Sequence, residues 1–201
     1  MNKFNRDQFN FNGNPKRITL HWTGGSYTPS SLDAEHYHFL IDGNGVVWQG
    51  KYSVADQDIT NSNYAAHTSQ FNTKNIGVAF CAMAGSKENG TFGAYPITVA
   101  QWDAAISLCT FLCSGYFIEP DKKHLASHCE IQSIHGVRQS GKWDVSAVTF
   151  MEETWAKLND VFRDDVAIQI EIGDGGTEPP APENEITVTV PRGTTVNIVE
   201  V

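Results

Sequence analysis

The stretch "NIGVAFCAMAG", residues 75–85, decides the fold. It is a nearly continuous apolar run that ends in glycine, which is typical of a strand buried on both faces. A strand of this kind belongs in the interior of a sheet that other layers cover. Helices are therefore expected on one or both faces of the sheet.

Two further stretches predict the neighbouring strands. "RITLHWT", residues 17–23, turns Ile18 and Leu20 inward and Thr19 and His21 outward, and glycines then begin a loop. "HYHFLID", "GNG" and "VVWQGK", residues 36–51, predict two strands joined by a tight turn. These four strands are expected to form one sheet, with His21 at the end of its strand.

Helical periodicity begins at residue 98. Thr98 and Gln101 have capping-box spacing, and apolar residues then recur at intervals of three and four, namely Val99, Trp102, Ile106, Cys109, Cys113 and Tyr116. A second helix, about 149–163, is predicted to begin with Thr149 and Glu152 as its cap and to bury Met151, Trp155, Leu158 and Phe162. The predicted fold class is α/β, with a central mixed sheet flanked by helices.

The composition changes after residue 165. "VAIQIEI" (166–172) alternates as a strand does, 173–185 is a proline-stiffened linker, and 186–201 alternates again around a turn. We therefore divide the chain into a domain, 1–165, and a C-terminal β appendage, 166–201. A lone hairpin is marginal in water, so this tail is expected to dock on the body, self-associate or join a partner's sheet.

Composition excludes several classes of function. The chain of 201 residues has 23 acidic and 14 basic residues, a net charge of −9, and no basic run, which argues against nucleic acid as a partner. No apolar run is long enough to span a bilayer, and the first residues lack a signal-peptide core, so synthesis in the cytoplasm is expected. The cysteines lack CxxC spacing and are interpreted as buried free thiols: Cys81, Cys109, Cys113 and Cys129.

Three residues of metal-binding type lie where side chains converge. His21 ends a strand, His128 follows a short apolar stretch, and Asp144 precedes the last predicted helix. A catalytic zinc site takes three such ligands and keeps a fourth position for water. Lys142 shares a face with Asp144 in an extended segment, where its ammonium could stabilise charge developing on a substrate oxygen. The alternative interpretation is that Lys142 and Asp144 are only a solvated pair of opposite charges in a turn.

Five motifs, in this order, carry a family resemblance. "ITLHWTGG", "HYHFLIDGNGVVWQG", "AAHTSQFNTKNIGVAF", "LASHCE" and "GKWD" resemble the zinc-dependent N-acetylmuramoyl-L-alanine amidases of the type that includes phage lysozymes and peptidoglycan recognition proteins. The resemblance covers roughly residues 16–163. It implies the fold of that family, a Zn²⁺ cofactor and peptidoglycan as the substrate.

Carried over by position, the resemblance assigns roles to individual residues. It implies zinc ligands His21, His128 and Asp144, and it gives Lys142 the stabilisation of the tetrahedral intermediate. Tyr37 matches a tyrosine near the metal-bound water, and His67 matches a histidine that lines the substrate groove. Three aromatic residues beside these motifs are expected either as walls of the groove or as core, namely Trp22, Tyr64 and Trp143.

The chain departs from the family pattern at three places. Ala79 stands where some relatives carry a glutamate base, so Tyr37 or water would have to assist proton transfer. The stretch between His128 and Asp144 is longer than expected and holds an additional His135 and Arg138. Val145 follows the third ligand where proline is common.

The predicted function is hydrolysis of the amide bond between N-acetylmuramic acid and L-alanine. The expected setting is a phage endolysin or virion-associated lysin that acts on the bacterial cell wall without inserting into a membrane. The alternatives are a non-catalytic module that binds peptidoglycan and a structural phage component that assembles through the tail. An intact set of three ligands favours catalysis over the binding module.

Overall fold

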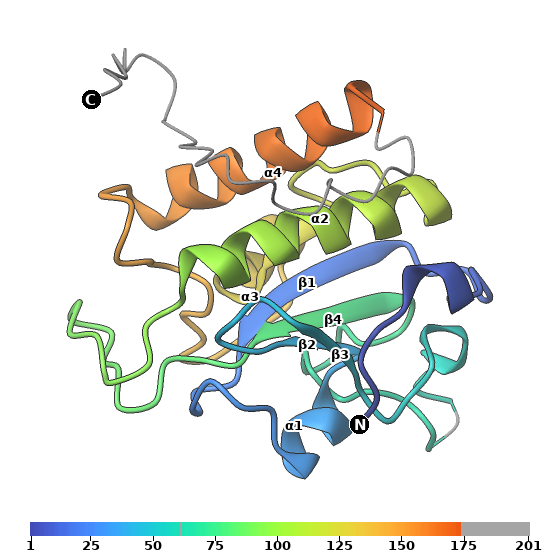
Figure 1. The fold of residues 1–201 in the computed structure, drawn as a ribbon, viewed down its shortest axis with the longest axis horizontal. Helices are drawn as coiled ribbons and strands as arrows, with labels where there is room; N and C mark the ends of the chain where they lie inside the picture. Colours follow the sequence, from blue (N-terminus) through green and yellow to red (C-terminus); the bar gives the residue numbers. More distant parts are fainter. Residues whose placement is uncertain (61, 174–201) are drawn as a thin grey trace, which may run out of the picture.

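A computed structural model describes residues 1–60 and 62–173, which form a five-stranded mixed sheet between helices (Figure 1). The strands are β1 (Arg17–Trp22), β2 (Phe39–Ile41), β3 (Val47–Gln49), β4 (Asn75–Phe80) and β5 (Leu125–Ser127). Their order is β3-β2-β4-β1-β5. Only the β2–β3 pair is antiparallel among these strands, so the predicted hairpin and the predicted mixed sheet are both confirmed.

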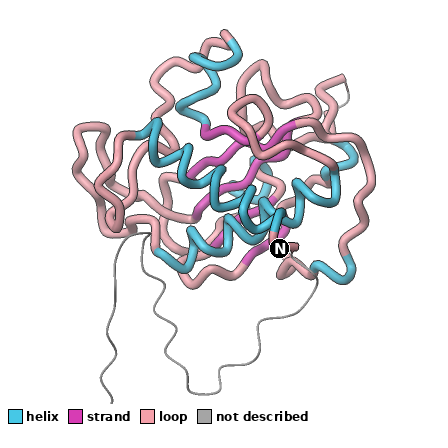
Figure 2. The backbone as a smooth tube through the Cα atoms, turned by 90° about the horizontal axis from the view of Figure 1, so that it is seen from above, coloured by secondary structure: helices cyan, strands magenta, loops and turns pink. Residues whose placement is uncertain are grey.

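The helices form two layers. The helices α2 (Val99–Tyr116) and α4 (Trp155–Glu171) lie side by side over one face of the sheet, and α1 (Ser31–His36) lies on the other side (Figure 1). The helix α3 (His128–His135) contacts β1 and β5. The view from above shows the helices crossing over the strands (Figure 2). Two short 3-10 turns, Arg6–Gln8 and Val54–Asp56, complete the elements.

The central strand β4 is buried along its whole length, as its apolar sequence predicts. It pairs in parallel with β1 on one side and with β2 on the other, and this register places Ala79 beside His21. Ile76, Val78 and Phe80 point into the main core under α2 and α4. The residues between them face the other side, so the alternation along β1 and β4 determines what each face of the sheet can do.

The helix α2 begins as predicted. Thr98 and Gln101 form a reciprocal capping box, in which each side chain accepts a hydrogen bond from the other residue's backbone N–H. Ile97 and Trp102, on either side of this cap, are both buried. The four cysteines are free thiols, as the sequence predicts; three of them are buried, whereas Cys129 is only partly buried.

The boundaries of α4 differ from the prediction. The helix begins after Thr154, whose side chain accepts from the backbone N–H of Lys157, so Thr149 is not its cap. It runs to Glu171, and the strand predicted over 166–172 is wrong. Val166 and Ile170 are one helical turn apart and both pack on the core, whereas Ile168 is exposed. The alternation of three apolar residues therefore contained a helical pair.

The remainder of the predicted β appendage lies outside the described residues, together with any self-association through it. Within the described part of the chain, no helix is both long enough and apolar enough to cross a membrane. The free edge of β3 is covered by the first residues, because Phe4 donates its backbone N–H to Val47 and Gln49 donates to Asn2. This pairing limits edge-to-edge association.

Candidate metal centre

Two parallel strands bring the candidate ligands together. Leu20 of β1 pairs with Ser127, the last residue of β5, so His21 in β1 and His128, which begins α3, lie side by side. Their ring centroids are 4.6 Å apart. Asp144, in the loop after α3, lies against both rings. One ligand atom from each of the three residues can be chosen so that all three lie within 4.8 Å of one another.

The first turn of α3 is held by a buried ion pair. Glu130 accepts from the backbone N–H of Ser127, and its two oxygens lie 2.8 and 3.0 Å from the guanidinium of Arg163 on α4. Both side chains are about 5% exposed. Because His128 begins this helix, α4 fixes its position through Glu130. Breaking a buried pair of this kind leaves a charge without compensation in the interior.

The carboxylate of Asp144 lies close to both imidazoles. Its Oδ2 is 3.0 Å from Nδ1 of His21 and 3.2 Å from Nδ1 of His128. His21 is 0% exposed, His128 2% and Asp144 7%. The backbone carbonyl of Asp144 accepts from the N–H of Cys129, which fixes the loop against α3. The centre is therefore well shielded from water.

The hydrogen bonds around His67 determine which nitrogen of His21 carries a proton. Nε2 of His67 lies 2.9 Å from the backbone carbonyl of Asn75, which can only accept, so this nitrogen must donate. Nδ1 of His67 is then an acceptor, and both the hydroxyl of Thr68 at 2.9 Å and Nε2–H of His21 at 3.0 Å face it. In a neutral His21 ring, Nδ1 therefore presents a lone pair to Asp144.

Gln139 determines the tautomer of His128 in the same way. Its side-chain Nε2 donates to the backbone carbonyl of Ser69 at 2.8 Å, which leaves Oε1 facing Nε2 of His128 at 2.9 Å. Since Oε1 accepts, Nε2 of His128 carries the ring proton. Nδ1 of His128 also presents a lone pair to Asp144.

Three electron-pair donors thus converge, and a positive charge between them is required. Burial lowers the pKa of His21 to about 4, so this ring is neutral at pH 7. Burial by itself would raise the pKa of Asp144, but the contacts with His128 and His21 outweigh it and hold the pKa below its usual range. The carboxylate of Asp144 thus favours a cation between the three ligand atoms. At neutral pH this cation is not a proton held by His21.

The donor set fits a zinc ion. Zinc accepts imidazole nitrogen and carboxylate oxygen together, whereas calcium and magnesium prefer oxygen alone. Each of the two imidazoles already has a partner for its other nitrogen, which is usual for metal-bound histidine. Three ligands leave a coordination position for water or substrate, as in hydrolytic zinc sites.

The structure places the other predicted site residues at different distances from this centre. The ring of Tyr37 lies 5.2 Å from that of His21, and burial followed by the charge of Asp144 raises the pKa of its phenol. Lys142 is exposed, and its charge contributes to lowering the pKa of His21. Trp22 is 8% exposed and belongs to the main core, and the half-buried Trp143 packs against that core, with the two rings edge to face at 4.6 Å.

Two residues predicted to bind substrate do not have the surroundings that the sequence indicated. His67 is 7% exposed and both its nitrogens are engaged, so it lies behind His21 and supports it. Tyr64 is half-buried, and within the described residues no hydrogen bond or ring contact joins it to the three candidate ligands. Sequence reasoning missed Gln139 altogether. The extended stretch between His128 and Asp144 was the one signal that pointed to its neighbourhood.

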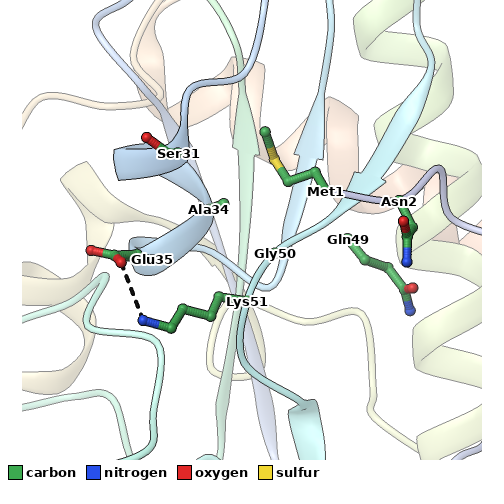
Figure 3. A pocket seen from close by; sticks show the side chains of 8 residues that line it. All are labelled: Met1, Asn2, Ser31, Ala34, Glu35, Gln49, Gly50 and Lys51. Carbon is green, nitrogen blue, oxygen red and sulfur yellow. Dashed lines mark hydrogen bonds and ion pairs between the residues drawn. The ribbon is translucent and has the colours of Figure 1, made fainter.

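One cavity lies away from the candidate centre. It has a volume of about 460 Å³ and opens between the first residues, α1 and the segment after β3 (Figure 3). An ion pair between Glu35 and Lys51, 3.1 Å long, lies beside it. None of the three candidate ligands lines this cavity, so the chemistry of the site does not extend into it.

The fold and the site define an α/β protein with a candidate mononuclear metal centre. The model of the family described as N-acetylmuramoyl-L-alanine amidase matches residues 11–146, a span that includes His21, His128 and Asp144. The chain belongs to this family. A comparison with curated proteins gives no match.

Solved structures with a similar fold include amidases and endolysins. The endolysin amidase LysCS from Clostridium intestinale URNW is 23% identical, covers 73% of this chain and 85% of its own, and gives a TM-score of 0.45. The amidase LysC from the same organism is 22% identical, with 79% and 95% covered and a TM-score of 0.46. The Ph2119 endolysin from the Thermus scotoductus MAT2119 bacteriophage is 16% identical, with 76% and 84% covered and a TM-score of 0.46.

Proposed function

We propose that this protein is a zinc-dependent amidase that cleaves the bond between N-acetylmuramic acid and L-alanine in peptidoglycan. The observation that carries the proposal is the convergence of His21, His128 and Asp144, with both imidazoles presenting Nδ1 to one carboxylate. Membership of the amidase family supports the reaction. The zinc ion would supply Lewis acidity and an acidified water molecule at this point.

The residues around the centre have distinct tasks in this proposal. Lys142 carries a positive charge near the site and would stabilise the negative charge that develops on the substrate carbonyl oxygen. Tyr37 keeps its phenolic proton because of its raised pKa, and so it can donate a hydrogen bond to the leaving amine. Ala79 lies beside His21 in the sheet, so this position offers no carboxylate base.

The substrate surface is proposed to include the half-buried Trp143, whose ring meets that of the buried Trp22 edge to face. Aromatic rings present apolar faces on which sugar rings stack. Trp143 lies between Lys142 and Asp144 in the sequence, so contact with the glycan would be coupled to the two functional positions. We propose the bacterial cell wall as the place of action, and use as a phage lysin remains a prediction.

The test is release of L-alanine amino termini from purified peptidoglycan, measured with chelator and after zinc is added back. Release that the chelator abolishes and zinc restores is the expected result. Retention of muropeptide and zinc without release would instead make the chain a binding module.

Single substitutions separate the roles. His128→Ala and Asp144→Ala are expected to lose bound zinc. Lys142→Ala should keep zinc and lose about 100- to 1,000-fold in kcat, because its charge acts on the transition state. Full zinc content in Asp144→Ala would refute the ligand set.

A further inference from the structure

We propose that Gln139 is a positioning residue, which fixes the tautomer and the orientation of His128 so that Nδ1 is the atom offered to the metal. The inference rests on the proposed zinc site. It assigns a role to the long stretch of sequence between His128 and Asp144. This stretch places Gln139 behind the imidazole of His128 and within hydrogen-bond reach of Ser69.

The side chain of Gln139 has one orientation that satisfies its surroundings. It is 7% exposed, and it bridges Nε2 of His128 and the carbonyl of Ser69 at 2.9 and 2.8 Å. Rotating the amide by half a turn would set its oxygen against the carbonyl oxygen of Ser69. A buried contact between two acceptors costs free energy, so the amide holds Oε1 toward His128.

The far end of this bridge is itself anchored by buried hydrogen bonds. Thr68 donates its backbone N–H to the side chain of Asn72, and the side chain of Gln57 donates to the backbone carbonyls of Ala65 and Asn72. Gln57 is 4% exposed, and Asn72 is 7% exposed. The carbonyl of Ser69 therefore belongs to a well-held segment, and it can direct the amide of Gln139.

The same segment also orients the second histidine. His67 accepts from Nε2 of His21 and donates to the backbone carbonyl of Asn75. Both imidazoles are thus directed from residues 67–75, which contribute no ligand atom of their own. Mutating a residue that holds a metal ligand without binding the metal itself typically lowers metal affinity by about 10- to 100-fold.

The first experiment measures zinc affinity by competition with a chromophoric chelator, so it needs no peptidoglycan. Gln139→Leu removes the acceptor and is expected to weaken zinc binding by about 10- to 100-fold. Gln139→Glu keeps an oxygen facing Nε2 of His128 but sets its other oxygen near the carbonyl of Ser69, so it is expected to weaken zinc binding less than Gln139→Leu does. Gln132→Leu is the matched control.

The control removes a different bond of the same loop. Gln132 accepts from the backbone N–H of Gln139 at 2.9 Å and does not touch His128. Unchanged affinity in Gln132→Leu is expected. If Gln139→Glu weakens binding as much as Gln139→Leu, the oxygen that faces His128 contributes nothing, and the proposal is overturned. Unchanged affinity in Gln139→Leu overturns it equally.

A second measurement compares the parent protein with Gln139→Leu by NMR and needs no zinc. Two-bond ¹H–¹⁵N correlation spectra of the parent protein report which nitrogen of each histidine carries the proton. We expect His128 as the Nε2–H tautomer, with loss of this single form in Gln139→Leu, and a proton on Nδ1 overturns the proposal. A parent protein that binds no zinc but shows the Nε2–H tautomer would refute the proposed function and leave the role of Gln139 intact.

Discussion

The two faces of the sheet are built from alternate residues of the same strands, yet they are held by different interactions. Toward α2 and α4, Ile18 and Leu20 of β1 meet other apolar side chains in one continuous core. Toward the other face, Thr19 and His21 belong to buried hydrogen-bond networks. Neighbouring positions of one strand therefore serve stability on one face and chemistry on the other.

The two faces differ in how strictly their side chains must be oriented. Apolar packing depends on volume and tolerates several side chains of about the right size. A buried polar network requires each donor to meet an acceptor, and an unsatisfied member costs free energy. Substitutions on the face toward α2 and α4, the helix face, should thus change stability without changing metal binding. Substitutions on the opposite face, the site face, should change metal binding, stability or both, according to which hydrogen bond is lost.

The largest expected effect on stability comes from the helix face. Phe162 of α4 is 1% exposed, and its ring meets that of Trp102 at 4.9 Å. Phe162→Ala should lower the free energy of unfolding by about 3–5 kcal/mol through lost transfer energy and a cavity. Urea unfolding in chelator measures this, with the exposed Ile168→Ala on the same helix as control. A parallel fall in the zinc affinity of the folded protein would show that the two faces are coupled.

A second effect depends on pH and belongs to the site face. Burial lowers the pKa of His38 to about 4, and its Nδ1 accepts from the backbone N–H of Gly77, so protonation would break that bond. The unfolded chain takes up the proton below pH 6.5 and the folded protein does not. Stability should therefore fall as pH decreases from about 6.5 to about 4, by on the order of 3 kcal/mol, and change no further from this source.

His38→Asn tests this contribution, because an amide oxygen can replace Nδ1 as the acceptor without titrating. The free energy of unfolding, measured in chelator at several pH values, should decline less steeply in the variant between pH 6.5 and 4. Parallel curves for the two proteins would mean that His38 does not carry the effect.

A third prediction concerns space on the site face. The ring of His67 lies against Gly77, and a Cβ there would approach it to 2.7 Å. Gly77→Ala should push His67 away from His21 and weaken zinc binding by about 10- to 100-fold, since the partner of a ligand is displaced. Chelator competition measures the affinity. The control is Ala126→Gly on β5, which alters the sheet at the position paired with Thr19. Gly24→Ala would not serve as a control, because Gly24 has a positive φ that strains an alanine.

The sequence predicted the helix face better than the site face for a physical reason. Strand alternation and the capping box of Thr98 and Gln101 are local patterns, so they can be seen in a single short stretch. The error at 166–172 arose because Val166, Ile168 and Ile170 satisfy a strand period and a helical spacing together. Packing against the core selected the helix.

The candidate ligands could be picked out from the sequence, whereas the residues that support them could not. His21, His128 and Asp144 were found from residue types at strand ends together with a family resemblance. The supports of His21 and His128 act through backbone carbonyls at Asn75 and Ser69, which any residue would provide. Gln139 and Ser69 are separated by 70 positions, so no spacing pattern could reveal their contact.

The smallest predicted effect tests whether a local signal has a local consequence. Thr98→Ala removes the acceptor for the backbone N–H of Gln101 and the donor to the carbonyl of Gly43. The free energy of unfolding should fall by about 1 kcal/mol, as is usual for a lost N-cap, and Thr98→Ser should recover most of it. Zinc affinity should be unchanged in both variants, because this cap lies at the start of α2 on the helix face. A weaker zinc site in Thr98→Ala alone would mean that α2 positions the centre through the sheet, and the separation of the two faces would then fail.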